Sequence, residues 1–460
     1  MKKISILFLS LFVLAACSSD DDTGGEAKSD AKEIVSYTFR AVDNDELDED
    51  VKGVIDKEKK TIKAELPSGT NLEKLKVEII VSDNAETGGI NRKIVSDFTI
   101  EDEITVTAEN GSKQKYSITI TAMLSERDAL IAIYRSNPNN ALGWNLEEDD
   151  LSKWEGIALG EDGSVVGLAL FSKGIRVLPK EIEVLNNLEN LTVFNDVLAE
   201  IPEELGSLSN LKQLNFSRNE LSELPEQLGQ LDQSLESLSI SGNQFTKVPN
   251  CIFKLTKLQN LLLASNEIDN IPTEIINLTN LEFLDIGDNK IPSLPDQIAD
   301  LTKLDTFLAY QNLLTAIPNW FGNLSSLTSI SFTENKLETF PNIIFSLDQL
   351  ELLYLNDCGL TDLPIEIGDL SNLVDLTLEG NFLGSLPAEL GTLSKLEFLN
   401  ITRNRIRSLP DELGNLESLK RLWIAWNQLP DFIPIPICLL IEKNEVDLKK
   451  DPFMFCDVSQ

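Results

Sequence analysis

Leucines and other apolar residues recur at one fixed spacing along more than half of the chain. Between Val165 and Asn427 the pattern L-x-x-L-x-L-x-x-N-x-L-x-x-L-P-x-x-I-x-x-L-x-x occurs twelve times, with ten steps of 23 residues and one of 24. In the copy that begins at Leu281, Asn289 fills the polar position and Pro295 the turn. Such self-similarity predicts a solenoid with one structural unit per repeat.

A single repeat is too small to be stable alone. About seven apolar side chains at about 2 kcal/mol each do not offset the backbone entropy of 23 ordered residues at about 1 to 2 kcal/mol each. Neighbouring repeats must therefore stack. The L-x-x-L-x-L segment predicts a short parallel strand, and the second half of the repeat an irregular or helical return on the convex side. Twelve strands about 4.8 Å apart would make a ladder about 58 Å long.

The polar ninth position of the repeat is asparagine in nine copies, while Lys173, Asp196 and Cys358 depart from it. A buried amide can turn the chain sharply when its donors and its acceptor all find backbone partners. We therefore expect a structural asparagine ladder rather than a catalytic set. Its members are Asn219, Asn243, Asn266, Asn289, Asn312, Asn335, Asn381, Asn404 and Asn427.

These repeats resemble the leucine-rich repeat family, in its 23-residue class with a Leu-Pro turn. The resemblance implies an α/β solenoid, a horseshoe of about twelve repeats over residues 165–430. It covers more than half of the chain and is specific for the fold. A fold alone does not name a ligand.

The first 17 residues carry a separate signal. Lys2 and Lys3 precede an apolar run from Ile4 to Ala16, which predicts a signal peptide and is too short for a lasting membrane span. The sequence Leu14-Ala15-Ala16-Cys17 resembles the bacterial lipobox, which implies that Cys17 carries lipid and becomes the mature N-terminus. The acidic stretch that follows resembles the export signal of surface lipoproteins. We expect an outer membrane lipoprotein on the cell surface, with residues 18–34 as a flexible tether of about 23 Å.

Residues 35–122 have an apolar period of two, interrupted by the turn signals Pro67-Ser68-Gly69, Gly88-Gly89 and Asn110-Gly111. This pattern predicts a β-sandwich, closed by a hairpin around Asn110-Gly111. The segment resembles the immunoglobulin-like spacers of bacterial surface lipoproteins. A spacer is the expected role, and ligand binding by the sandwich itself is the alternative.

The solenoid needs a cap at each end. Residues 123–164 resemble the N-terminal cap of plant extracellular leucine-rich repeat receptors through Trp154, Gly156 and Ile157, but lack its paired cysteines, so Trp144 and Trp154 are expected to pack in their place. Residues 431–460 form the C-terminal cap.

Cysteines fall into three groups. Cys438 and Cys456 can form a disulfide in the C-terminal cap, worth about 3 kcal/mol, or remain thiols, and the sequence leaves both open. Cys358 is a variant of the asparagine ladder, and Cys251 is expected to pack as a small apolar residue.

Charge and composition narrow the function. The formal charge of −36, from 75 acidic and 39 basic residues, argues against nucleic acid or anionic lipid as a partner. The absence of histidine excludes Ser-His and Cys-His nucleophile pairs and histidine-containing zinc sites. The acidic run from Asp43 to Asp50 lacks the glycine and glutamate spacing of an EF-hand loop, so we expect a solvated turn. We expect no cofactor, no bound metal and no enzymatic activity.

If the strand leucines point inward, the third, fifth and seventh positions face the open concave side. Aromatic side chains there would leave apolar area in water unless a partner covers it, and aromatic and arginine side chains dominate binding hot spots. Phe171 and Phe194, next to the cap, are expected to lean on their neighbours instead. The expected ligand-binding residues are Phe283, Asp285, Tyr310, Tyr354, Asp357, Phe398, Arg421, Trp423 and Trp426.

The leading hypothesis is recognition of an extracellular protein or peptide. A glycan is the alternative ligand, because aromatic faces flanked by Asp, Asn and Arg also suit sugar rings. A purely structural surface spacer is a further alternative, and it would bind nothing on the concave face.

Overall fold

The computed structural model describes residues 27–456 except 46, 68, 69, 71, 73, 74, 88–93 and 97–101. The predicted signal peptide of residues 1–17, Cys17 and the first part of the tether lie outside the described residues. The chain divides into two compact units, Met1–Met123 and Leu124–Gln460.

The first unit is all-β. Its two four-stranded sheets have the strand orders β2-β1-β5-β6 and β3-β4-β8-β7. One apolar core is built from both sheets, with Tyr37 and Phe39 from the first and Tyr116 and Ile118 from the second, so the unit is a β-sandwich. Its elements are β1 (Ile34–Phe39), η1 (Ala41–Asp43), β2 (Val51–Lys52), β3 (Val54–Asp56), β4 (Thr61–Leu66), β5 (Leu75–Val81), β6 (Ile94–Ser96), β7 (Asp102–Thr107) and β8 (Lys113–Ala122).

The predicted tether is too long at its C-terminal end. The Glu33 N–H donates to Ser82 Oγ at 2.8 Å, and the Asn110 N–H donates to the Ser29 carbonyl at 3.1 Å. Residues 29–33 are therefore attached to the sandwich. The prediction was wrong there because polar residues can still make backbone hydrogen bonds to a neighbouring strand end.

The second unit begins with the N-terminal cap, which contains α1 (Glu126–Ser136), η2 (Leu151–Lys153) and β9 (Ile157–Leu159). Ser125 and Asp128 form a capping box at the start of α1, which satisfies two backbone donors. Trp144 and Trp154 stack with ring centroids 4.9 Å apart. These rings close the apolar core at the first repeat, as expected in the absence of cap cysteines.

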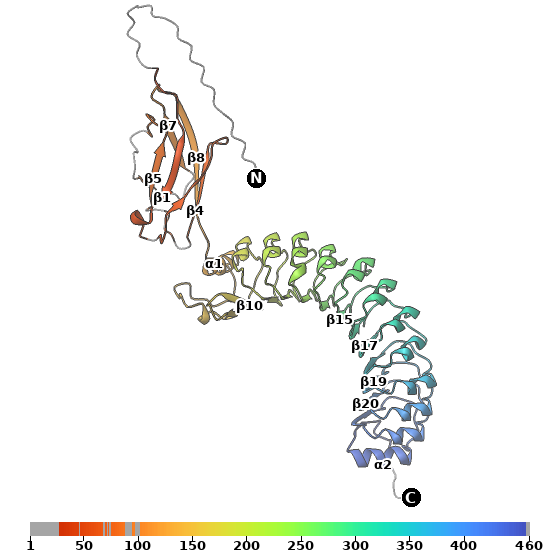
Figure 1. Cartoon of the computed structure of the whole chain (residues 1–460). Helices are drawn as coiled ribbons and strands as arrows, with labels where there is room; N and C mark the ends of the chain where they lie inside the picture. The colour runs from red at the N-terminus through yellow and green to blue at the C-terminus, as the bar shows by residue number, and fades with distance from the viewer. Residues whose placement is uncertain are drawn as a thin grey trace, which may run out of the picture. The chain divides into compact units, whose positions relative to one another are not determined.

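Each of the twelve repeats contributes one strand to a 14-stranded sheet, which β9 closes at one end and β22 (Asp447–Lys449) at the other. The repeat strands pair in parallel and in register. Figure 1 shows them along the inner side of a curved solenoid. They are β10 (Val165–Phe171), β11 (Asn190–Phe194), β12 (Gln213–Asn215), β13 (Ser237–Ser239), β14 (Asn260–Leu262), β15 (Phe283–Asp285), β16 (Thr306–Leu308), β17 (Ser329–Ser331), β18 (Leu352–Tyr354), β19 (Asp375–Thr377), β20 (Phe398–Asn400) and β21 (Arg421–Trp423).

The returns on the convex side are single turns of 3-10 helix, and each begins after the proline of the Leu-Pro turn. Proline suits this place because its fixed φ begins the turn and its missing N–H would have no partner there. The returns are η3 (Lys180–Val184), η4 (Glu203–Ser207), η5 (Glu226–Gln233), η6 (Asn250–Lys254), η7 (Thr273–Asn277), η8 (Asp296–Asp300), η9 (Asn319–Asn323), η10 (Asn342–Ser346), η11 (Ile365–Asp369), η12 (Ala388–Thr392) and η13 (Asp411–Asn415).

The asparagine ladder joins adjacent repeats. Asn381 Nδ2 donates to the carbonyls of Leu355 at 2.8 Å and Leu378 at 2.9 Å, and its Oδ1 accepts from the Leu360 N–H at 3.0 Å. The other asparagines of the ladder repeat this geometry. Each amide therefore satisfies backbone groups of its own repeat and of the preceding one.

The eighth position of the repeat has a positive φ in all twelve copies. Its N–H donates to the seventh-position carbonyl of the next repeat, as from Asp288 to Tyr310 at 2.8 Å and from Arg403 to Ala425 at 3.0 Å. The left-handed conformation thus carries the hydrogen-bond ladder one step beyond the strand. The residues are Ser172, Asn195, Arg218, Gly242, Ser265, Asp288, Gln311, Glu334, Asp357, Gly380, Arg403 and Trp426.

The asparagine ladder is interrupted at Cys358. The buried thiol donates to the carbonyls of Phe332 and Asn356 at 3.2 and 3.3 Å, and burial raises its pKa to about 12. A thiol has no amide oxygen, so the N–H of Leu337 lacks the acceptor that Asn381 gives to Leu360, and no described residue replaces it. A hollow of about 660 Å³ opens beside this interruption.

The C-terminal cap contains α2 (Ile435–Asn444) and β22. A disulfide joins Cys438 and Cys456. The cap also completes the backbone ladder, because the Trp426 N–H donates to both carboxylate oxygens of Asp451 at 3.0 Å. An acidic side chain thus replaces the next repeat's carbonyl.

Asn381→Ala should lower the free energy of unfolding by about 3 kcal/mol, because several buried backbone groups lose their partners. Chemical denaturation monitored by circular dichroism measures the change. Asn372→Ala is the matched control: this exposed asparagine donates to one backbone carbonyl, Asp348 at 2.7 Å, and its loss should cost about 1 kcal/mol or less. Equal effects of the two variants would contradict a structural ladder.

Candidate recognition surface

The strands present their third and fifth positions on the concave face, and the loop after each strand adds the seventh and eighth. Parallel pairing in register places equivalent side chains of successive repeats in rows, as with Asp375, Phe398 and Arg421 at the third position. Adjacent members of a row are about 4.8 Å apart. Each side chain is therefore next to its counterparts in the two neighbouring repeats.

Aromatic and charged side chains meet at the C-terminal end of this face. We define the C-terminal cluster as Tyr354, Asp375, Phe398, Arg421, Trp423 and Lys449. Phe398 and Trp423 pack edge to face with ring centroids 4.9 Å apart. The Arg421 guanidinium lies over the Phe398 ring at 4.0 Å, and the Lys449 ammonium over the Trp423 ring at 4.6 Å.

Charge complementarity continues from this cluster towards the earlier repeats. Arg421 Nη2 lies 3.7 Å from Asp375 Oδ2. Burial raises the pKa of the Tyr354 phenol, and the nearby Asp375 carboxylate raises it further. The cluster therefore combines cations at the end of the solenoid with an acid one repeat earlier.

The prediction that Phe398 is exposed was wrong. Only 7% of its surface is accessible, because Arg421 and Trp423 of the following repeat cover the ring. Its role is to support those two side chains.

Trp426 is the opposite case, with 70% of its surface exposed. Its φ of 61° is one that bulky side chains rarely adopt. Glycine occupies the same position at Gly242 and Gly380, so the backbone does not require a large ring there. The fold gives no reason for the exposed tryptophan.

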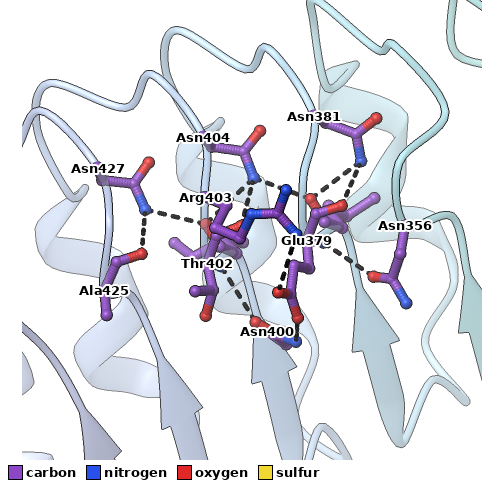
Figure 2. Close-up of polar contacts among 11 residues, drawn as sticks. Asn356, Glu379, Asn381, Asn400, Thr402, Arg403, Asn404, Ala425 and Asn427 are labelled. Atoms are coloured by element: carbon purple, nitrogen blue, oxygen red, sulfur yellow. Dashed lines mark hydrogen bonds and ion pairs between the residues drawn. The ribbon is translucent and has the colours of Figure 1, made fainter.

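Figure 2 shows a polar network between the C-terminal cluster and the asparagine ladder. Asn356 Oδ1 accepts from the Glu379 N–H at 2.8 Å, and the Glu379 carboxylate accepts from Asn400 Nδ2 at 3.0 Å. Arg403 Nη1 lies 3.8 Å from the other oxygen of Glu379. These contacts fix the side chains of three consecutive repeats.

Asp357 lies at the edge of this network. Partial burial raises its pKa, although Arg403 opposes the shift. A Cβ on Gly380 would lie 2.0 Å from Asp357 Oδ1, so the glycine of the next repeat makes room for the carboxylate.

Asp285 and Tyr310 are separate from the C-terminal cluster and line a hollow of about 530 Å³ on repeats two to seven. We call it the serine hollow, after the hydroxyl groups in its lining; its polar residues include Thr192, Asn215, Ser217, Ser239, Ser241 and Ser265. Phe283 is half-buried in the same repeat as Asp285. The predicted residues thus form two groups rather than one patch.

Asp285 is more buried than an open concave face predicts, with 8% of its surface exposed. Leu262 and Leu308 pair with it on the two adjacent strands. Burial raises its pKa, and one hydrogen bond from the Gly287 N–H at 2.9 Å partly offsets the shift.

Sequence reasoning missed Lys449 and the hydroxyl groups of the serine hollow. Lys449 lies in the irregular cap, where no repeat register places it on the sheet. The hollow did leave a signal, since the seventh position is small in four consecutive repeats: Ser217, Ser241, Ala264 and Gly287.

In the part of the chain that the structure describes, no set of three or more Cys, Asp or Glu side chains is grouped to hold a metal ion. No described helix has the length and apolar content needed to span a bilayer.

Known families match both units of the chain. A family described as "SGBP, N-terminal" matches residues 42–120. A leucine-rich repeat region matches residues 258–353 and 335–433, and a single leucine-rich repeat matches residues 210–231 and 234–255. A comparison with curated proteins finds no match.

Solved structures with similar folds come from bacteria and plants. A leucine-rich repeat protein of Leptospira interrogans is 31% identical, over 62% of this chain and 82% of that one, with a TM-score of 0.47. An internalin from Listeria monocytogenes is 22% identical, over 65% of this chain and 91% of that one, with a TM-score of 0.54. The Arabidopsis receptor kinase HAESA, in complex with the peptide hormone IDA and the co-receptor SERK1, is 24% identical, over 72% of this chain and 61% of that one, with a TM-score of 0.56.

Asp285→Asn should stabilise the protein at neutral pH. A carboxyl whose pKa is raised by folding binds its proton more tightly in the folded state, so stability falls as pH rises from the ordinary carboxyl range through the raised value. The amide removes this loss and keeps an acceptor for the Gly287 N–H. Denaturant unfolding at pH 3 and pH 7 should show a gain at pH 7 that shrinks at pH 3.

Glu282→Gln, which removes one exposed negative charge from the same repeat, controls for the change in net charge. A gain for Asp285→Asn at pH 7 no larger than that of Glu282→Gln would show that burial of the carboxylate carries no cost.

Proposed function

The chain belongs to the leucine-rich repeat family, and we propose that it is a surface-anchored binding protein that recognises an extracellular protein or peptide on its concave face. The match of its first unit to the SGBP N-terminal family suggests a bacterial cell-surface protein. Leucine-rich repeat proteins are typically binding scaffolds without enzymatic activity.

The observation that carries the proposal is the exposed Trp426 beside the C-terminal cluster. Its ring and those of Trp423 and Tyr354 offer apolar area next to fixed charges, which is the composition of a protein-binding hot spot. HAESA, with a similar fold, was solved with a peptide hormone bound, which supports a peptide as the class of ligand.

Mechanistically, the cluster binds with little ordering cost. Arg421 and Lys449 are already stacked on aromatic rings, and Glu379 is already hydrogen-bonded. Side chains held in the free protein lose little entropy on binding. The aromatic rings then contribute affinity, and the charges contribute selectivity and the rate of association.

A glycan fits this particular cluster less well. Stacking of a sugar ring needs an open aromatic face, but Arg421 covers Phe398 and Lys449 lies over Trp423. Cations at these faces instead suit acidic groups of a peptide or protein partner.

Trp426→Gly should separate binding from folding. The free energy of unfolding should stay the same or rise by up to about 1 kcal/mol, because glycine relieves the positive φ but adds freedom to the unfolded chain. The affinity for peptides selected against the wild-type protein from a display library should fall at least about tenfold, as expected for a hot-spot residue.

Phe382→Ala is the matched control for this experiment. Phe382 is also an exposed aromatic, stacked with Arg405 at 4.3 Å, but it follows the asparagine of its repeat rather than facing the concave side. Selected peptides that bind Trp426→Gly and wild type equally, or that are lost with Phe382→Ala, would contradict the proposed surface.

The anchor is proposed from the sequence around Cys17. Cells expressing the protein should incorporate radiolabelled palmitate into it, and Cys17→Ser should abolish the label and release the protein from the outer membrane fraction. Unchanged labelling of Cys17→Ser would contradict the lipid anchor. The export of the protein to the outer face is tested by protease treatment of intact cells.

A further inference from the structure

The serine hollow is a second feature of the concave face that protein recognition at the C-terminal cluster does not use. It lies on repeats two to seven, whereas the cluster belongs to repeats nine to twelve and the cap. Its walls and floor differ from the cluster in chemistry. The hollow has its own ligand requirements for that reason.

Small side chains create the hollow. The seventh-position row runs from Phe194 through four small residues to Tyr310. Phe194 and Tyr310 are five strands apart, which is about 24 Å along the sheet. The result is an elongated trough with an aromatic ring at each end.

Hydroxyl and amide groups line the trough, and some of them lack partners. The Ser217 hydroxyl contacts Asn215 Oδ1 and Ser239 Oγ, both at 2.6 Å, while the Asn215 amide nitrogen has no hydrogen-bond partner among the described residues. Ser241 Oγ is buried in the floor and is likewise unpartnered in the described part of the chain. Buried polar groups without partners are costly, so a ligand with its own donors and acceptors would satisfy them.

The aromatic ends are held in place. The Arg218 guanidinium lies 5.5 Å from the centre of the Phe194 ring. The Tyr310 ring lies directly over Gly287, since a Cβ on that glycine would be 2.3 Å from two of its ring carbons. Both rings are fixed beside a polar floor.

Charge is scarce in the lining. Arg218 and Asp285 are its charged residues, and Asp285 is almost covered. The overall charge of −36 also opposes an anionic ligand. The ligand that matches this lining is uncharged and rich in hydroxyl groups.

We propose that the serine hollow binds a neutral oligosaccharide, at a site separate from the proposed protein-binding cluster. Sugar hydroxyl groups both donate and accept, as serine and asparagine side chains require, and the apolar faces of sugar rings pack on aromatic side chains. A chain of several sugar rings fits an elongated trough with an aromatic ring at each end.

The test begins with an array that carries neutral glucans, mannans, galactans and xylans beside uronate-containing and sulfated glycans. The wild-type protein should bind a neutral member, and calorimetric titration with that oligosaccharide should then give its affinity. Binding only to charged glycans, or to no glycan, overturns the proposal.

Two variants of the hollow locate the site. Ser241→Leu fills the floor and should abolish binding. Gly287→Ala displaces the Tyr310 ring and should weaken binding about tenfold, whereas Tyr310→Phe keeps the ring in place and should bind within about threefold of wild type. Thermal unfolding confirms that each variant is folded, and Gly287→Ala decides if Ser241→Leu does not fold.

Trp426→Gly distinguishes this site from the protein-binding cluster. It should leave glycan affinity unchanged while selected peptides are lost. Glycan binding that survives Ser241→Leu and Gly287→Ala but fails in Trp426→Gly overturns the assignment to the hollow. Peptide binding that fails in all tests while glycan binding persists would refute only the function proposed for the cluster.

Discussion

The structure depends on the left-handed residue at the eighth position of every repeat. Its N–H reaches the next repeat, as from Arg218 to the Ser241 carbonyl at 2.7 Å, and the ladder asparagine that follows it satisfies the turn. A positive φ is unfavourable for most side chains, yet arginine, glutamine, glutamate and tryptophan all adopt it here. The inter-repeat hydrogen bonds impose this conformation, because a normal φ would leave buried backbone groups without partners.

This constraint explains why the concave face is a fixed surface. Each side chain is held by a strand on both sides and by a hydrogen-bonded loop after it. Chemical differences between repeats therefore become spatial differences along one sheet. Small and hydroxyl-bearing residues in repeats two to six give a trough, and large or charged residues in repeats nine to twelve give the cluster around Trp423.

Much of this architecture follows from the spacing of residues. The period of 23 residues predicts one strand per repeat, the ninth-position asparagines predict the ladder, and the tryptophans of residues 123–164 predict a cap closed without disulfides. Each of these depends on positions within one repeat. The lipid anchor and the surface-export signal remain expectations from the sequence, because the residues that carry them are outside the described part.

The candidate site was harder to predict because its properties depend on contacts between repeats. Phe398 looks exposed in a repeat pattern, but the side chain at the same position one repeat later covers it. Asp285 looks solvated, but two leucines on adjacent strands bury it. Lys449 comes from a cap with no repeat pattern. Pattern analysis assigns a face to each residue, whereas exposure is decided by the size of the neighbours.

The thiol at Cys358 has a mechanical consequence. A solenoid holds together through nearest-neighbour interfaces, so its unfolding begins where one interface is weakest. The missing amide acceptor at Leu337 puts that weak place between the eighth and ninth repeats. Under tension the chain would part there into two blocks, one with the serine trough and one with the tryptophans, and a ligand on either block would protect only that block from opening.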